Sequence, residues 1–378
     1  MNIPFHKPSL NRQTKKLFDQ VVNSGWLTTG RQVNDFEAGV KQLLGFEYAK
    51  AVSSCTAALH LAYIVLGLKK GDEVIVPSFT FCSTINMVIH VGATPVFCDI
   101  DERTLCLDPI DVSRKMTSRT KAVVVIHFAG MPADLNAIKK ICKKRKIPIV
   151  EDAAHAFLTK YQGDYIGNHG NIVCFSFYAT KTLTTAEGGL IVTLSQKQLK
   201  KVKMLALHGL SENAWSRYDK KGSWKYRVLT AGYKYNMSNV HAAIGLSQLP
   251  HVVKEKGMRI RYADEYRRLL KKVPEIILPI NPPYKKSEHS WHLFTIRMRD
   301  PEKRDLLIEY LKKHGVGTSV HFIPNHQQPY YRKFNRVVLP TTETVGKSIL
   351  SLPIYPDLGF EKIHKITDLI KGFFRYEK

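Results

Sequence analysis

The sequence predicts an α/β protein, a three-layer sandwich with a mostly parallel central sheet, followed by a smaller C-terminal α+β domain. Three observations support this. Between residues 49 and 152, strand-like and helix-like patterns alternate. Several strand-like runs are continuously apolar, as expected when both faces of a parallel sheet are covered. After residue 273 the pattern changes to strand, helix, strand. We therefore expect a large domain over residues 1–253 and a small domain over residues 254–378.

The elements of the large domain follow in order. Strands are expected at 49–54, 72–78, 94–100, 121–130 and 147–152, and helices at 56–68, 82–92, 108–116 and 134–146. Two further apolar runs, 175–178 and 188–194, are predicted strands on either side of a loop. Residues 211–227 have no clear period and predict a long loop. Helices are then expected at 237–253 and 255–273. In the small domain, 289–298 and 316–322 are predicted strands around a helix at 302–315.

Composition narrows the function without fixing it. The six cysteines lie apart with no CxxC pair, so no metal site is expected. No apolar stretch could span a bilayer, and the first residues lack the features of a signal peptide, which predicts a cytoplasmic protein without membrane association. The formal net charge is +25. No nucleic-acid-binding motif accompanies this charge, so nucleic acid is not an expected partner. Diffuse positive charge would also attract a phosphorylated small molecule, and the charge alone does not choose the partner.

Open α/β sheets bind ligands at the carboxyl ends of their strands, and four such ends carry polar or aromatic residues. Ser54–Leu59 opens a helix with small and hydroxyl residues, which suits a phosphate, although a plain helix cap looks the same. Phe81 could stack on a planar ligand or belong to the core. The pair Asp152 and His155 follows another strand, where acids rarely serve packing alone.

The fourth strand end carries Lys181, in a loop of small and hydroxyl residues with no acid nearer in sequence than Glu187. A lysine chosen at random is usually a surface residue. A desolvated lysine without a close acid, however, favours the neutral amine that condenses with carbonyl groups. A phosphate cradle, an aromatic, an acid and an amine are together what pyridoxal 5′-phosphate (PLP) requires, so the sequence predicts PLP as the cofactor.

Motifs along nearly the whole chain resemble those of the DegT/StrS-type sugar aminotransferases, which are PLP enzymes of fold type I. They include "SGWLTTG", "SSCTAALHLA", "GDEVIVPSFTF", "EDAAHA", "FSFYATKTLTTAEGGLIVT", "GYKYNMSNVHAAIGLSQL" and "HFIPNHQQPYY". Three of these look most like the branch that makes UDP-4-amino-4-deoxy-L-arabinose and related aminosugars. Family members that dehydrate sugars have histidine in place of the catalytic lysine. The presence of Lys181 therefore favours transamination.

The resemblance implies a role for each matching position. Lys181 would be the catalytic residue, binding the cofactor and moving a proton, and Asp152 would pair with the pyridine nitrogen. Phe81 would cover one ring face, and His155 would lie near the ring. Asn236 would reach the cofactor phosphate of a neighbouring subunit, so that active sites are shared in a homodimer. The remaining expected contacts are Thr56, Ala57 and Ser176 with the phosphate, and Trp26, Leu27, Thr28 and His326 with the sugar.

The implied reaction moves an amino group from L-glutamate to the ketone of a nucleotide-linked keto-sugar, most simply a UDP-4-keto sugar. The product would serve surface polysaccharide or lipid A modification. Tyr178 replaces the histidine common in the family, and Phe81 replaces the tryptophan usual in the branch, which leaves the exact sugar open. Cys55 and Ala186 also depart from the usual residues. A PLP-dependent dehydratase of the same fold is one alternative, and a PLP-binding regulator that binds DNA is another.

Overall fold

The computed structural model describes residues 2–211, 225–334 and 336–376. At its centre is a seven-stranded sheet with the strand order β1-β9-β8-β5-β4-β2-β3. Strands β8, β5, β4, β2 and β3 are parallel neighbours, whereas β9 runs antiparallel to both β8 and β1. The bounds are β1 (Ala49–Val52), β2 (Glu73–Pro77), β3 (Thr94–Cys98), β4 (Thr120–Ile126), β5 (Ile149–Asp152), β8 (Ile172–Ser176) and β9 (Gly189–Val192). The prediction of a mostly parallel central sheet is confirmed.

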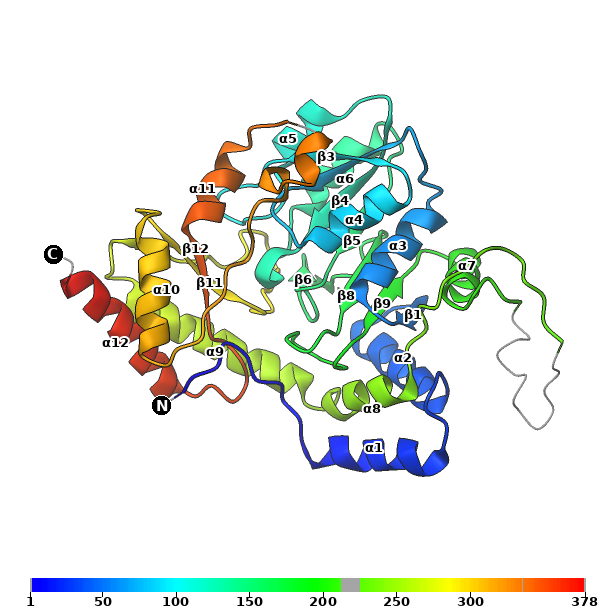
Figure 1. Cartoon of the computed structure of the whole chain (residues 1–378), viewed down its shortest axis with the longest axis horizontal. Helices are drawn as coiled ribbons and strands as arrows, with labels where there is room; N and C mark the ends of the chain where they lie inside the picture. Colours follow the sequence, from blue (N-terminus) through cyan, green and yellow to red (C-terminus); the bar gives the residue numbers. More distant parts are fainter. Residues whose placement is uncertain (1, 212–224, 335, 377–378) are drawn as a thin grey trace.

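Successive side chains of a strand point to opposite faces of the sheet, so each buried strand supplies two cores. In β4, Val123 and Val125 belong to one apolar cluster, and Ala122 and Val124 to the other. The first cluster is covered by α2 (Arg31–Leu44), α5 (Pro109–Lys115), α6 (Leu135–Lys143) and α8 (Asn239–Gln248). The second is covered by α3 (Cys55–Val65), α4 (Cys82–His90) and α7 (Gln196–Ala206). These layers form the sandwich (Figure 1).

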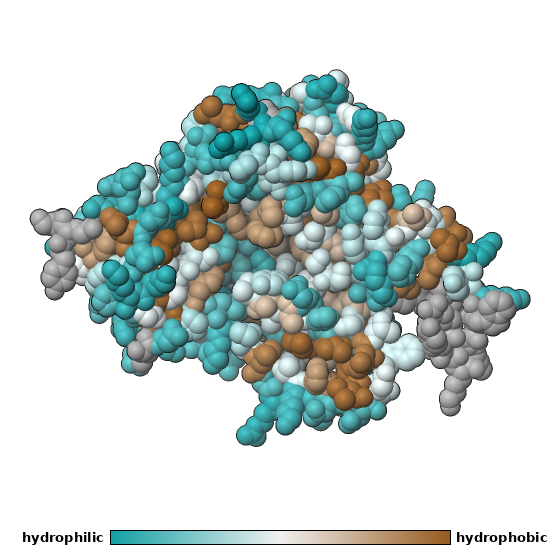
Figure 2. Space-filling model, in the orientation of Figure 1, coloured by the Kyte–Doolittle hydropathy of each residue, from teal (hydrophilic) through white to brown (hydrophobic). Residues whose placement is uncertain are grey.

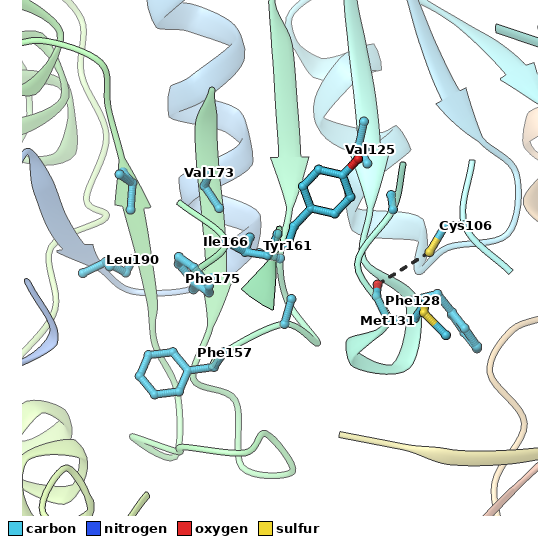
Figure 3. Packing of buried hydrophobic residues seen from close by; sticks show 14 of the residues in the cluster. Cys106, Val125, Phe128, Met131, Phe157, Tyr161, Ile166, Val173, Phe175 and Leu190 are labelled. Carbon is cyan, nitrogen blue, oxygen red and sulfur yellow. Dashed lines mark hydrogen bonds between the residues drawn. The ribbon is translucent and has the colours of Figure 1, made fainter. Parts of the chain in front are cut away.

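The first cluster is rich in aromatic rings. Phe157 meets Phe175 edge to face, with ring centroids 6.0 Å apart, and the Cys106 thiol donates to the Met131 carbonyl oxygen at 3.6 Å (Figure 3). Phe175 is fully buried. Burying a side chain of this size contributes on the order of 2–3 kcal/mol. This packing fixes β8, whose last residue is Ser176.

A third apolar cluster organises the C-terminal part of the chain. Its elements are α9 (Val252–Leu270), β10 (Ile276–Ile277), β11 (Phe294–Met298), α10 (Lys303–Lys313), β12 (Ile349–Leu352) and α12 (Phe360–Tyr376), whereas α11 (Pro340–Ser348) supplies Val345 to the first cluster. Ile3 belongs to the same cluster and pairs with Val316. The N-terminal segment thus starts beside the small domain and then runs to α1 (Arg12–Ser24) under the large one (Figure 1). The domain boundary predicted at 253/254 falls within α9.

Short elements complete the described chain: β6 (Lys160–Tyr161), β7 (Asp164–Tyr165), and 3-10 turns at Phe128–Gly130, Asn325–Gln327 and Tyr331–Lys333. The strand predicted at 316–322 is wrong. Only Val316 and Ser319 form bridges, each to a different segment, so no ladder develops. Most of the loop predicted at 211–227 lies outside the described residues. Within the described ranges, no helix is long and apolar enough to cross a membrane.

Candidate active site

A cavity of about 620 Å³ opens where the parallel strands end. Asp152 is the last residue of β5, and Ser176 is the last residue of β8. The first residues of α3 and α4 form the adjoining wall. Side chains from outside the sheet complete the enclosure, namely Phe5, His6, His292, Leu293, Ser319, Val320, His321, Phe322 and Ile354. The cavity therefore lies at the strand ends, as predicted for an open α/β sheet, and residues of both domains line it.

The start of α3 presents backbone donors to this cavity. Ser54 caps the helix, and its hydroxyl oxygen accepts from the N–H of Ala57 at 3.0 Å. The N–H groups of Cys55 and Thr56 make no hydrogen bond within the described part of the chain. Gly189 of β9 packs so closely that a Cβ there would lie 2.5 Å from the Ser54 carbonyl carbon. Two free N–H groups at a helix N-terminus bind an anion well.

Asp152 is buried and held by two hydrogen bonds. The Thr84 hydroxyl donates to Oδ2 at 2.6 Å, and the N–H of Ala154 donates to Oδ1 at 3.1 Å. Burial raises the pKa of this carboxyl above its usual value, and these two bonds, together with the charge of Lys181, partly offset the increase. The carboxylate therefore has a fixed orientation and would gain from a cationic N–H beside it.

Lys181 is half-buried and lines the same cavity. Its Nζ makes no hydrogen bond or ion pair with any described residue. Burial lowers its pKa to about 8, although the neighbouring Cys55 and Asp152 act in the opposite direction. A larger fraction of the amine is therefore neutral near pH 7 than for an ordinary lysine, as a nucleophilic role requires.

Two rings predicted to flank the cofactor also lie here. His155 is buried, and its Nδ1 accepts the N–H of Ala129 at 3.2 Å, which assigns the ring proton to Nε2. Burial, and then the charges of Lys181 and His321, lower the pKa of His155 well below its usual value, so the ring is neutral. Phe81 is 61 % exposed and therefore available to a ligand.

Of the predicted residues, the structure brings six to this cavity: Thr56, Phe81, Asp152, His155, Ser176 and Lys181. Ala57 does not line the cavity. Its N–H donates to the capping Ser54, and the free N–H groups are those of Cys55 and Thr56.

Asn236 and the predicted sugar contacts Trp26, Leu27 and Thr28 also lie outside this chain's cavity, next to one another. Asn236 Nδ2 donates to the Thr29 hydroxyl at 2.8 Å, and the N–H of Asn239 donates to the carbonyls of Leu27 and Thr28. The Asn236 Oδ1 atom has no partner among the described residues.

The structure does not bring His326 to the cavity, which corrects its assignment as a sugar contact. It is buried, with Nδ1 2.7 Å from the Ser78 hydroxyl and Nε2 3.1 Å from a Glu343 carboxylate oxygen. Both ring nitrogens are occupied, so His326 joins the end of β2 to α11.

Sequence reasoning missed Thr84 and three further histidines of the cavity, His6, His292 and His321. The motif "HFIPNHQQPYY" contains two histidines, and the first, His321, is the one that faces the cavity. Thr84 gave no signal, because a threonine in a helical pattern looks the same wherever it points.

These residues fit PLP. The free N–H groups and hydroxyls at the start of α3 suit its phosphate, and Asp152 suits its ring nitrogen. Phe81 and His155 suit the ring faces, and Lys181 suits the aldehyde. Each of these groups has been placed above by its own contacts, and none required a ligand to define it. The described residues contain no group of three or more side chains that could hold a metal ion.

Comparisons with known proteins agree. Residues 8–371 match the model of the DegT/DnrJ/EryC1/StrS aminotransferase family. The chain is 40 % identical to the spore coat polysaccharide biosynthesis protein SpsC of Bacillus subtilis (strain 168), over 98 % of this chain and 97 % of that protein. The aminotransferase TlmJ from Streptoalloteichus hindustanus superposes with a TM-score of 0.93 at 30 % identity, over 100 % of both chains. The PLP form of Spr1654 from Streptococcus pneumoniae superposes with a TM-score of 0.91 at 29 % identity, over 97 % of both chains. With its lysine, carboxylate and phosphate cradle in place, this chain belongs to the DegT/DnrJ/EryC1/StrS family and is a PLP-dependent sugar aminotransferase.

Proposed function

We propose that the enzyme transfers the amino group of L-glutamate to the ketone of a nucleotide-linked keto-sugar, most simply a UDP-4-keto sugar, in the synthesis of a surface polysaccharide. The observation that carries the transaminase chemistry is the half-buried Lys181, without a partner among the described residues, in one cavity with Asp152. The similarity to a spore coat polysaccharide biosynthesis protein supports the pathway class. The resemblance in "SGWLTTG" and "EDAAHA" supports the sugar class.

PLP supplies an aldehyde that carries the amino group and a ring that accepts electrons. The chain supplies the remainder. With the cofactor bound, Asp152 would keep a proton on its ring nitrogen, and Thr84 holds the Asp152 carboxylate in place. The Lys181 amine would move the proton between the carbon of the donor and the cofactor. Its lowered pKa suits a base that works near neutral pH.

We further propose a homodimer in which Asn236 and the segment Trp26–Thr28 complete the partner's cavity. These residues lie together and away from this chain's own cavity. Exposed apolar side chains lie on or beside α1, namely Leu10, Phe18, Val22, Trp26 and Leu27. Apolar surface also gathers over α1 and α8 at the lower edge of Figure 2. A contiguous apolar face of this kind is typical of an interface between subunits.

The substrate is tested by incubating the purified enzyme with L-glutamate and a panel of UDP-, dTDP- and GDP-linked 3-keto and 4-keto sugars, with the products identified by mass. We expect amination of a UDP-4-keto sugar together with release of 2-oxoglutarate. Lys181→Ala serves as the inactive control. Deoxygenation in place of amination would support the dehydratase. Amination confined to free sugars would refute the nucleotide requirement.

The high positive charge gives a second test of a diphosphate substrate. A cationic surface raises the rate of encounter with an anion, and salt screens this attraction. We expect kcat/KM for the nucleotide sugar to fall with added salt more steeply than kcat. Equal salt dependence of the two constants would count against a charged substrate.

Shared sites are tested by mixing two inactive variants, Lys181→Ala and Asn236→Ala. Hybrid dimers would contain one site with both residues intact, so random mixing should restore about a quarter of the wild-type activity. Mixed variants that stay inactive, while each still forms a dimer, would refute the sharing of sites. Two Lys181 variants mixed together provide the control.

A further inference from the structure

Three imidazoles lie in the cavity without a role in the reaction described above: those of His6, His292 and His321. They come from three separate parts of the chain, the N-terminal segment, the residues before β11, and the segment after α10. The charge of Lys181 contributes to lowering the pKa of each of them. The three rings and the catalytic amine line one cavity.

The nitrogens of these rings are incompletely used. His292 is 5 % exposed, and its Nδ1 has no hydrogen-bond partner among the described residues. Nε2 of the half-buried His6 also has no hydrogen-bond partner among the described residues. His321 places Nδ1 2.9 Å from the Ser351 hydroxyl, which leaves its Nε2 without a partner in the described chain. By contrast, the Nδ1 of His155 is already occupied by a backbone N–H. Buried polar atoms in folded proteins are normally paired, so unpaired nitrogens beside a cavity indicate a ligand.

Among the described residues, the cavity lining offers few other cationic groups for an anion. Among the side chains that line the cavity there is no arginine, and Lys181 is the single lysine, whereas Asp152 and Glu187 are acidic. An α-amino acid must bring its nitrogen to the atom that Lys181 binds. Its carboxylate carbon is two bonds from that nitrogen and so must lie close to Lys181, in the cavity that the three imidazoles also line.

We propose that His6, His292 and His321 form the site that binds the α-carboxylate of the amino donor. This inference rests on the proposed function, because it assumes an amino-acid donor. The described lining of the cavity contains no arginine that could bind this carboxylate, and the three imidazoles take that role.

The electrostatics make such a site responsive to pH. Burial, and then nearby positive charge, lower the pKa of His6 and of His321 to about 4. The rings are thus neutral in the free enzyme at pH 7. The groups that face them include the positive Lys181 and Arg259, the acidic Asp152 and Glu187, the neutral His155, and Tyr355 beside His6. An arriving carboxylate adds negative charge and raises the proton affinity of the imidazoles. Binding should therefore be accompanied by proton uptake and should strengthen as the pH falls.

The test uses the PLP-loaded enzyme and glutarate, a dicarboxylate that lacks an amine and cannot react. Calorimetric titrations in two buffers of different ionisation heat give the affinity and the number of protons taken up. Glutaramide, the neutral analogue, is the ligand control. The variants are His6→Gln, His292→Gln and His321→Gln, and the exposed His251→Gln is the matched control. Thermal unfolding of each variant establishes that it is folded.

We expect glutarate, but not glutaramide, to bind with proton uptake. Each cavity variant should weaken glutarate by about ten- to a hundredfold and reduce the uptake, because each loses one charge-assisted hydrogen bond. His251→Gln should match the wild type. Folded variants that bind glutarate with wild-type affinity, or binding without proton uptake, would overturn the proposal. If glutamate fails to donate its amino group to the wild type, the proposed function fails, and glutarate binding still decides the role of the histidines.

Discussion

Replacing Lys181 with methionine should stabilise the cofactor-free enzyme, although it abolishes activity. The pKa of this amine falls from 10.5 to about 8 in the folded protein, a difference of about 2.5. Each pKa unit corresponds to about 1.36 kcal/mol, so keeping the charged amine in place costs at most about 3.4 kcal/mol. Because Lys181 is half-buried, solvent reduces this, and we expect a gain of about 2 kcal/mol at pH 7. Methionine has a similar length and carries no charge to desolvate.

The sign of the pH dependence provides the sharper test. Below pH 8 the amine is charged in both the folded and the unfolded states, so the full cost is present. Between pH 8 and 10.5 the unfolded state binds more protons, and wild-type stability rises with pH. The gap between Lys181→Met and the wild type should therefore close by about pH 10.5. Urea unfolding of the cofactor-free proteins at one fixed protein concentration measures this. A gap that is absent at pH 7, or that does not change with pH, would refute the reasoning. The exposed Lys200→Met is the control.

Three further changes test the surroundings of the site. Thr84→Val removes a 2.6 Å hydrogen bond to Asp152 and should weaken PLP binding by about 1.5–3 kcal/mol, measured by fluorescence titration, whereas Thr84→Ser should retain affinity. Gly189→Ala places a Cβ against the backbone at the start of α3. It should lower the free energy of unfolding by about 1–3 kcal/mol and weaken binding of the cofactor phosphate. Gly257 lies in α9, where an added Cβ would have no neighbouring atom within 4 Å. Gly257→Ala should therefore raise the free energy of unfolding by about 0.5–1 kcal/mol. Glu151→Gln should destabilise at pH 7 by about 1–3 kcal/mol. Burial acts to raise the pKa of Glu151, but hydrogen bonds from neighbouring side chains outweigh it and hold this pKa below 4.5. The stability difference between Glu151→Gln and the wild type should therefore shrink as acid protonates the wild-type carboxyl. Equal unfolding profiles of Glu151→Gln and wild type at pH 7 would contradict this.

The sequence predicted the large domain well because local signals there agree with the fold. Several buried strands are continuous apolar runs, and β5 and β8 end at Asp152 and Ser176, polar residues that face the cavity. Lys181 and Asp152 could be found for this reason. The rule that ligands lie at strand ends converts a pattern along the chain into a position in space.

The other wall of the cavity could not be found in this way. His6, His292 and His321 lie in segments without a regular period, and only the tertiary fold brings these distant segments to one cavity. The choice between His321 and His326 shows the same limit. Both lie in one motif, and only tertiary contacts with Ser78 and Glu343 withdraw the second from the cavity.

Phe5 and Ile354 face the same cavity from nearly opposite ends of the chain. During synthesis on the ribosome, Phe5 emerges well before Ile354. The complete pocket can therefore form around the vitamin B6 derivative only after Ile354 has been synthesised. Uptake of the cofactor would then report on a late step of folding, and a nascent chain stalled before residue 354 should remain colourless.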